Sequence, residues 1–129
     1  MLAPNNNGQC QSWQTITFTR GDTAGFKFQR LDTDGNVIMQ IADELYFTVK
    51  TQFTNQGFVL QKTLDDMTFD EDGFYHFVIE PEDTNALKFA DYVYDIETIQ
   101  GGVKSTPLKG KFVMTPESTW QANEGGNNG

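Results

Sequence analysis

The sequence predicts an all-β protein, an immunoglobulin-like sandwich of two antiparallel sheets with about seven strands and one short helical turn near residues 81–87. Three observations support this fold class. Large and polar side chains alternate with a period of two residues, as they do in strands that bury one face. Turn-forming residues separate the alternating segments. The stretch 74–96 reads as a strand, a helical turn and a second strand, which is the corner that joins the two sheets.

The first alternating segment places Ile16 and Phe18 on one face and threonines on the other. Later segments repeat this pattern. Residues 58–60 are also predicted to start a strand, but their pattern does not show which side chains face the core. The side chains predicted to lie together on one face of each segment are Phe26 and Phe28; Leu45, Phe47 and Val49; Tyr75, Phe77 and Ile79; Tyr92, Tyr94 and Ile96; and Leu108, Phe112 and Met114. Two such sheets are stable only when their apolar faces pack together.

Turn residues lie where the predicted strands end. Residues 32–36 contain aspartate, glycine and asparagine, and residues 101–102 are both glycine. These residue types tolerate a positive φ. Pro81 suits the first turn of a short helix, because its fixed φ is helical and its missing N–H is not needed there. The sequence therefore predicts hairpins at the first two places and the helical turn at the third.

The last hairpin has a predicted register. If it is centred on Gly102, Asp95 lies across from Lys109 on the solvent face. Such a cross-strand pair contributes only about 0.2–1 kcal/mol, but it helps to fix the register. Pro107 cannot donate a hydrogen bond to its neighbour, so we expect a bulge beside it.

The chain of 129 residues is predicted to hold one domain, residues 14–119. A polar leader, 1–13, and a polar tail, 120–129, are predicted to be flexible, because neither can bury enough apolar surface to offset the entropy of ordering. The first residues lack the basic and apolar regions of a secretory signal. The single cysteine, Cys10, is expected to be an inert thiol, with an intermolecular bridge as the alternative. These features predict synthesis in a reducing cytoplasm.

The charge balance bears on the partners. The net charge is −9, from 18 acidic and 9 basic residues. Nucleic acids and anionic lipids are bound through lysine and arginine, so this field has the wrong sign for either partner. The sequence also has no apolar run long enough to span a membrane. We therefore expect neither a nucleic acid nor a membrane as partner, and we expect the acidity either to keep the surface soluble or to steer a basic partner.

Two acidic segments are candidate cation sites. Residues 32–36 resemble the start of a calcium loop, but Val37 stands where an EF-hand needs glycine and Asp43 where it needs glutamate, which favours a hairpin turn. The loop 65–72 carries five carboxylates that could gather a hard cation. A solvated loop is the preferred interpretation there. The members of that cluster are Asp65, Asp66, Asp70, Glu71 and Asp72.

The sequence predicts a protein that is not an enzyme and has no cofactor. His76 is the only histidine, and on the face of Phe74 and Val78 it is interpreted as a half-covered strand residue. Common nucleophile, metal and phosphate-loop motifs are absent, and a glycosidase-like carboxylate pair would need a cleft that a small sandwich lacks. The tripeptide at 20–22, Arg-Gly-Asp, matches an integrin motif but is interpreted as a turn.

Two tryptophans flank the predicted strands. Trp13 comes just before the first strand and Trp120 just after the last. Each could cap an end of the sandwich or anchor the chain to a neighbour, since tryptophan is enriched at interface hot spots. Both interpretations stay open from sequence, and the second makes these residues the candidate interface anchors.

The order of these segments resembles that of small immunoglobulin-like proteins from phage and prophage structural modules. It is similar to the N-terminal domain of the phage baseplate upper protein family, over roughly residues 15–119. The segments that carry the resemblance are 20–23, 32–36, 47–50, 73–75, 79–87, 92–96 and 108–116. A full baseplate upper protein continues into further domains after this module, whereas here we expect only the polar tail 120–129.

The resemblance implies a non-enzymatic virion protein made in the bacterial cytoplasm and attached to the tail, baseplate or capsid. Because of this expected departure from the family pattern, we expect an accessory or decoration protein as readily as a baseplate part. The implied partners are other virion proteins, and exposed sheet edges add self-association. One alternative is a module that binds host glycan through Tyr46, Tyr75 or His76, provided that they face solvent together. Another is a domain of a bacterial surface protein.

Overall fold

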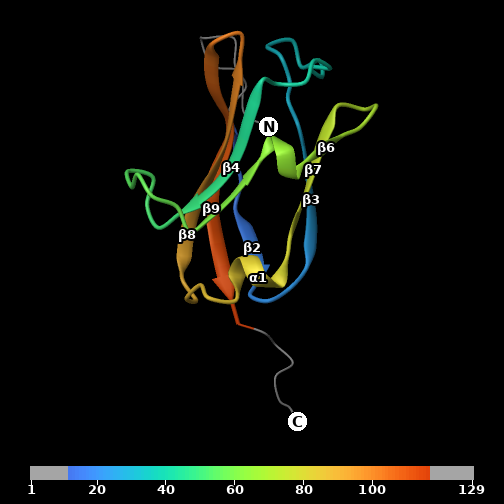
Figure 1. Ribbon diagram of the computed structural model, residues 1–129. Coiled ribbons are helices and arrows are strands. Elements are labelled where there is room, and N and C mark those ends of the chain that lie inside the picture. Colours follow the sequence, from blue (N-terminus) through green and yellow to red (C-terminus); the bar gives the residue numbers. More distant parts are fainter. Residues whose placement is uncertain (1–11, 117–129) are drawn as a thin grey trace.

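The computed structural model describes residues 12–116, which form two β-sheets packed face to face (Figure 1). The large sheet contains β1 (Ser12–Trp13), β2 (Ile16–Thr19), β4 (Glu44–Lys50), β5 (Leu60–Thr63), β8 (Asp91–Gln100) and β9 (Val103–Thr115). The small sheet contains β3 (Ala24–Gln29), β6 (Thr68–Phe69) and β7 (Phe74–Ile79). The helical elements are η1 (Leu64–Asp66) and α1 (Pro81–Thr84). The predicted all-β sandwich and its helical turn are therefore confirmed.

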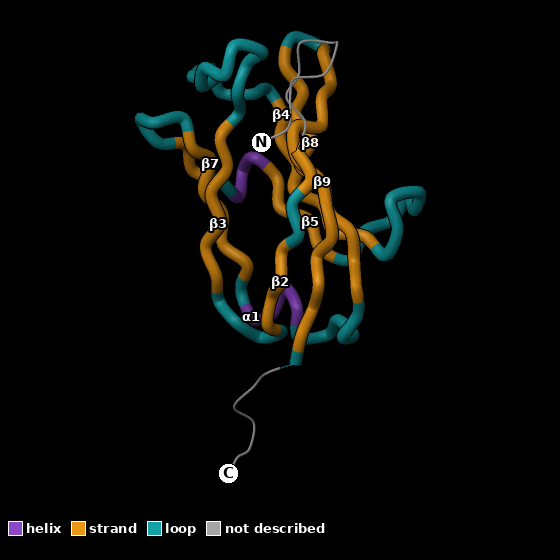
Figure 2. Tube along the Cα trace, turned by 180° about the vertical axis from the view of Figure 1, so that it is seen from behind, coloured by secondary structure: helices purple, strands orange, loops and turns teal. Residues whose placement is uncertain are grey.

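The two sheets form separate layers when the molecule is seen from behind (Figure 2). The large sheet has the order β1-β9-β8-β4-β5, with β2 also paired to β9, and the small sheet has the order β3-β7-β6. Pairing is antiparallel except at one edge, where β1 and β2 run parallel to β9. The prediction of a wholly antiparallel sandwich is wrong at that edge. Residues Ser12 and Trp13, which the prediction placed in the leader, form β1.

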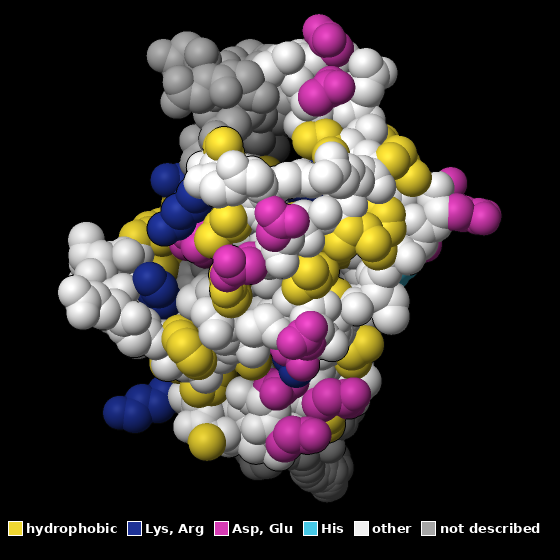
Figure 3. Space-filling model, turned by 45° about the horizontal axis from the view of Figure 1, so that its top comes forward, with side chains coloured by type: hydrophobic (Ala, Val, Ile, Leu, Met, Phe, Trp, Pro, Cys, Tyr) yellow, Lys and Arg dark blue, Asp and Glu magenta, His cyan; other side chains and the backbone are white. Residues whose placement is uncertain are grey.

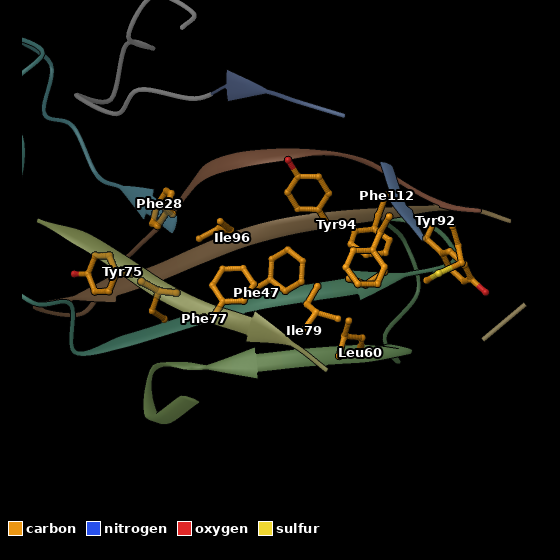
Figure 4. Close-up of a cluster of buried hydrophobic side chains, with 14 residues drawn as sticks. Phe28, Phe47, Leu60, Tyr75, Phe77, Ile79, Tyr92, Tyr94, Ile96 and Phe112 are labelled. Atoms are coloured by element: carbon orange, nitrogen blue, oxygen red, sulfur yellow. The ribbon is translucent and has the colours of Figure 1, made fainter. Parts of the chain in front are cut away.

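The core lies between the sheets and is rich in aromatic rings (Figure 4). Phe47 is its centre: its ring centroid is 4.8 Å from that of Phe77 and 5.6 Å from that of Tyr94. A third ring, that of Phe112, lies edge-on at 6.3 Å. Each set of side chains predicted to share one face of a strand points inward, which confirms the period-two assignment. Offset and edge-on aromatic pairs of this kind add stability beyond their buried area.

The corner between the sheets is closed by side chains around α1. The Tyr92 hydroxyl donates a 2.8 Å hydrogen bond to the carbonyl of Lys88, the tyrosine-corner contact of immunoglobulin-like sandwiches. Thr84, fully buried, accepts a 3.0 Å hydrogen bond from the Gly21 N–H in the turn between β2 and β3. The first contact ties the segment after α1 to β8, and the second ties α1 to the turn between β2 and β3.

The β8–β9 hairpin has the predicted register. Asp95 lies directly across from Lys109, and Gln100 pairs with Val103 at the turn. The register shifts between Ile96 and Thr98, opposite Pro107, so the bulge expected beside the proline is also confirmed. A proline without an N–H cannot continue the ladder, and the bulge removes the need for that bond.

A close backbone crossing joins β1, β2 and β9. Between β1 and β2, the Gln14 N–H donates to the Lys109 carbonyl at 3.0 Å, which brings the Gln14 backbone onto Gly110. The Gln14 carbonyl accepts a 2.7 Å hydrogen bond from the hydroxyl of Tyr94, a residue of β8. Tyr94 is almost fully buried, and this burial raises its pKa from 10.0 to about 12.

Alkaline titration is expected to reveal this tyrosine. Because the folded-state pKa of Tyr94 is raised, its contribution to stability is complete below pH 10 and is lost as the pH rises toward about 12. Absorbance titrations of the wild-type protein and of Tyr94→Phe should differ by one phenolate transition. This transition, present only in the wild type, should be centred near pH 12. The same variant should lower the free energy of unfolding by about 0.5–1.5 kcal/mol, through the lost hydrogen bond. If the transition that Tyr94→Phe removes lies near pH 10 instead, the prediction is wrong.

Candidate binding surfaces

The outer face of the large sheet presents polar side chains in rows across neighbouring strands. The register aligns Gln61, Thr48, Asp95 and Lys109 from β5, β4, β8 and β9 in one row, and Trp13 of β1 extends it. The loop 51–59, between β4 and β5, projects outward from this face (Figure 1). The face and the loop together form the two surfaces described next.

The first surface is an exposed aromatic cluster made of Trp13, Phe53 and Lys109. The ring centroids of Trp13 and Phe53 are 5.9 Å apart in an edge-on arrangement. The Lys109 ammonium lies 5.5 Å from the centroid of the Phe53 ring, within the range of a cation–π contact. Trp13 nevertheless stays 50% exposed, so the contact with Phe53 covers only part of it. The second predicted anchor, Trp120, lies outside the described residues.

The second surface is a groove between the loop 51–59 and the sheet, with a volume of about 380 Å³. Its floor comes from β4, β5 and β8, and Phe58 and Gln56 come from the loop. The Phe58 ring is 55% exposed. The lining residues are Tyr46, Thr48, Lys50, Gln56, Phe58, Gln61, Asp95, Glu97 and Lys104. This site thus combines aromatic, amide, hydroxyl and charged groups of both signs.

Charges within the groove are balanced. Asp95 has a raised pKa, first because burial disfavours its charged form and second because Glu97 is near, while three lysines oppose the shift. Glu97 pairs with Lys104 at 3.3 Å. The Lys50 ammonium donates a 2.9 Å hydrogen bond to the carbonyl of Asn55 and so ties the loop to β4.

A third surface lies at the end of the sandwich that carries the loop 30–43 and the β8–β9 turn. Met39, Ile41 and Val103 are exposed there, near the acidic residues Asp32 and Asp43. Figure 3 brings this end forward and shows hydrophobic and acidic side chains interspersed on it. We refer to this surface, 30–43 with 100–103, as the loop end.

Arg30 links the two segments of the loop end by hydrogen bonds. Its buried guanidinium donates through Nη2 to the Gln40 carbonyl at 2.7 Å and to Gln100 Oε1 at 2.8 Å. Its Nε has no hydrogen-bond partner among the described residues. Sequence reasoning did not single out this arginine, because nothing in the local pattern around β3 distinguishes a buried arginine from a solvated one.

Two carboxylates of the loop 65–72, those of Asp66 and Asp70, accept hydrogen bonds from neighbouring backbone groups. The Asp66 carboxylate accepts a 2.9 Å hydrogen bond from the Thr63 N–H at the start of η1. Asp70 accepts from the backbone N–H groups of Asp72 and Phe74, both near 3 Å. Within residues 12–116, no three histidine, cysteine, aspartate or glutamate side chains gather as metal ligands.

His76 lies on the outer face of the small sheet, as interpreted from the sequence, and pairs with Asp70 at 2.7 Å. This hydrogen bond is the main cause of the lowered pKa of Asp70. Tyr75 faces the core instead and is fully buried, with its hydroxyl accepting from the Ala42 N–H at 3.0 Å. The three candidate glycan contacts therefore do not share a surface: only Tyr46 lies on the groove.

Both short sequence motifs form turns. The Asp32 carboxylate accepts 2.9 Å hydrogen bonds from the N–H groups of Asp34 and Asn36, inside a hairpin closed by a bridge between Leu31 and Val37. Residues 20–22 make the turn after β2, closed by a 3.1 Å bond from the Asp22 N–H to the Thr19 carbonyl.

Sequence reasoning singled out Trp13 but missed Phe53 and the groove, because both depend on the loop 51–59. This loop carries two phenylalanines, Phe53 and Phe58, in a polar segment with asparagine, glutamines and glycine. Large apolar residues placed singly in a polar loop are the signal that could have indicated a binding loop.

Comparison with known proteins gives no relative from which a role could be transferred: no protein-family model matches the chain, and no curated protein is significantly similar to it. No helix within residues 12–116 has the length and apolar character needed to cross a membrane.

Proposed function

We propose that this chain is a non-enzymatic structural or accessory protein of a phage particle, attached to the tail, baseplate or capsid, and that it acts through contacts with other virion proteins. The resemblance in segment order supports the assignment to a phage particle. The observation that supports a contact role most directly is the aromatic cluster of Trp13, Phe53 and Lys109.

The cluster has the composition of an interface anchor. Tryptophan contributes more than most residues to the binding energy of protein interfaces, and its half-exposed ring leaves apolar area for a partner to cover. It lies on β1, at the edge of the large sheet, so a neighbouring protein can reach it without displacing the core. Lys109 adds a cation beside the rings.

The loop end supports a second contact on the same particle. Met39, Ile41 and Val103 are exposed there, and acidic side chains are interspersed with hydrophobic ones on this end (Figure 3). Exposed apolar residues offer area for a partner to cover, and the overall charge of −9 favours a basic partner.

Removing the anchor should reduce assembly. Mass spectrometry of purified particles should detect the wild-type chain, and Trp13→Ala should lower its amount per particle by at least tenfold, because a hot-spot tryptophan carries about 2 kcal/mol or more of binding energy. Phe89→Ala is the matched control, since Phe89 is exposed to a similar degree but contacts Arg20 instead. Circular dichroism should show that both variants fold. Absence of the wild-type chain from the particles would refute the proposal.

A further inference from the structure

The groove beside the loop 51–59 has features of a ligand site that an ordinary solvated sheet face lacks. Its volume of about 380 Å³ falls within the range of small-molecule sites, about 300–1,000 Å³. The loop that forms its wall is held in place, because Lys50 bonds the Asn55 carbonyl and Phe53 packs on Trp13. More than half of the surface of Phe58 is exposed, although β5, the strand that follows it, packs on the core.

The polar groups of the groove match a neutral ligand with many hydroxyl groups. Two carboxylates, of Asp95 and Glu97, accept hydrogen bonds, and two ammonium groups, of Lys50 and Lys104, donate them. The amides of Gln56 and Gln61 do both. Equal numbers of acids and bases give the site no net charge, which disfavours a phosphate or another simple anion.

An exposed aromatic ring beside such groups narrows the ligand class further. A sugar ring has an apolar C–H face that packs on an aromatic surface, and a rim of hydroxyls that both donate and accept. An aromatic platform with a few convergent polar groups is the arrangement expected of a site for such an amphipathic ligand. Phe58 supplies the platform and the floor of β4, β5 and β8 supplies the polar groups.

We propose that this groove binds one sugar ring of a glycan, with Phe58 against its C–H face and Asp95, Glu97 and Gln61 bonded to its hydroxyls. The groove shares no lining residue with the aromatic cluster, although the two adjoin where Asp95 of β8 lies across from Lys109 of β9. The inference does not depend on the proposed virion role.

A glycan array followed by titration calorimetry tests this site. The array should carry the hexoses, amino sugars and deoxysugars of bacterial surfaces, and the full-length chain should bind at least one of them. Phe58→Ala should weaken that binding at least tenfold, and Glu97→Gln should weaken it as well. Val78→Ala is the matched control, because Val78 is an exposed apolar residue on the outer face of the small sheet.

Backbone chemical shifts locate the bound sugar. On titration with the sugar, we expect the amides of residues 46–61 and 95–104 to shift in the wild-type protein and to stay unchanged in Phe58→Ala. An array without any binder overturns the proposal. So does a sugar that binds Phe58→Ala as well as wild type, or a preference for extended peptides over glycans. None of these outcomes affects the particle measurement described for Trp13.

Discussion

Phe47→Ala is expected to lower the free energy of unfolding by about 3–5 kcal/mol, the range for truncation of a buried phenylalanine. Phe47 has no exposed surface and packs against rings from both sheets, with Phe77 at 4.8 Å and Phe112 at 6.3 Å between centroids. Its removal leaves a cavity lined by large rigid rings, which cannot collapse easily to fill it. A domain with a stability of about 5–15 kcal/mol would lose a large part of it.

Urea denaturation followed by fluorescence measures this loss, with Phe58→Ala as the control. The same atoms are removed in the control, but its ring is 55% exposed, so the change should stay within about 0.5 kcal/mol. A loss below about 1 kcal/mol for Phe47→Ala would mean that the rings around it repack and that the centre of the core is placed wrongly. The control also establishes that Phe58→Ala is folded for the glycan experiment.

Gly110→Ala is expected to lower the free energy of unfolding by about 3 kcal/mol, at the upper end of the range for overpacking. A Cβ at this position would lie 1.9 Å from the Gln14 carbonyl oxygen and 2.7 Å from its carbon. Both are backbone atoms, and the Gln14 backbone is held by its bonds to Lys109 and Tyr94. The crossing between β1 and β2 must therefore move away from β9, with loss of those hydrogen bonds.

Gly25→Ala is the matched control for that substitution. Gly25 is also a strand glycine, in β3, but nothing lies within 4 Å of the position of its Cβ. We expect Gly25→Ala to change the free energy of unfolding by no more than about 0.5 kcal/mol, measured by urea denaturation under the same conditions. Equal stabilities of the two alanine variants would show that the segment around Gln14 does not lie on β9.

Much of this fold follows from patterns within single strands. A strand repeats every two residues, so the alternation of Leu45, Phe47 and Val49 was enough to identify the buried face of β4. The register of β8 and β9 was equally accessible, because a short glycine turn fixes which residues face each other. Pro107 marked the bulge, since only proline lacks the N–H that the ladder needs.

Features that join distant segments could not be predicted in this way. The parallel pairing of β2 with β9 links Ile16 to Phe112, and no local pattern distinguishes it from an antiparallel edge. The groove depends on how the loop 51–59 lies over the sheet, through contacts such as Phe53 with Trp13. Alternation grouped Tyr75 with Phe77 and Ile79, but it left open which face of β7 met the core, and hence whether Tyr75 could meet a ligand.

The parallel edge determines how the domain carries mechanical load. β2 and β9 run in the same direction side by side, from the pair Ile16–Phe112 to the pair Thr19–Thr115. Tension between the start of β2 and the end of β9 would slide the two strands along each other, because it pulls them in opposite directions. All the hydrogen bonds between them then share the force at once, rather than opening one after another as they do when a hairpin is unzipped.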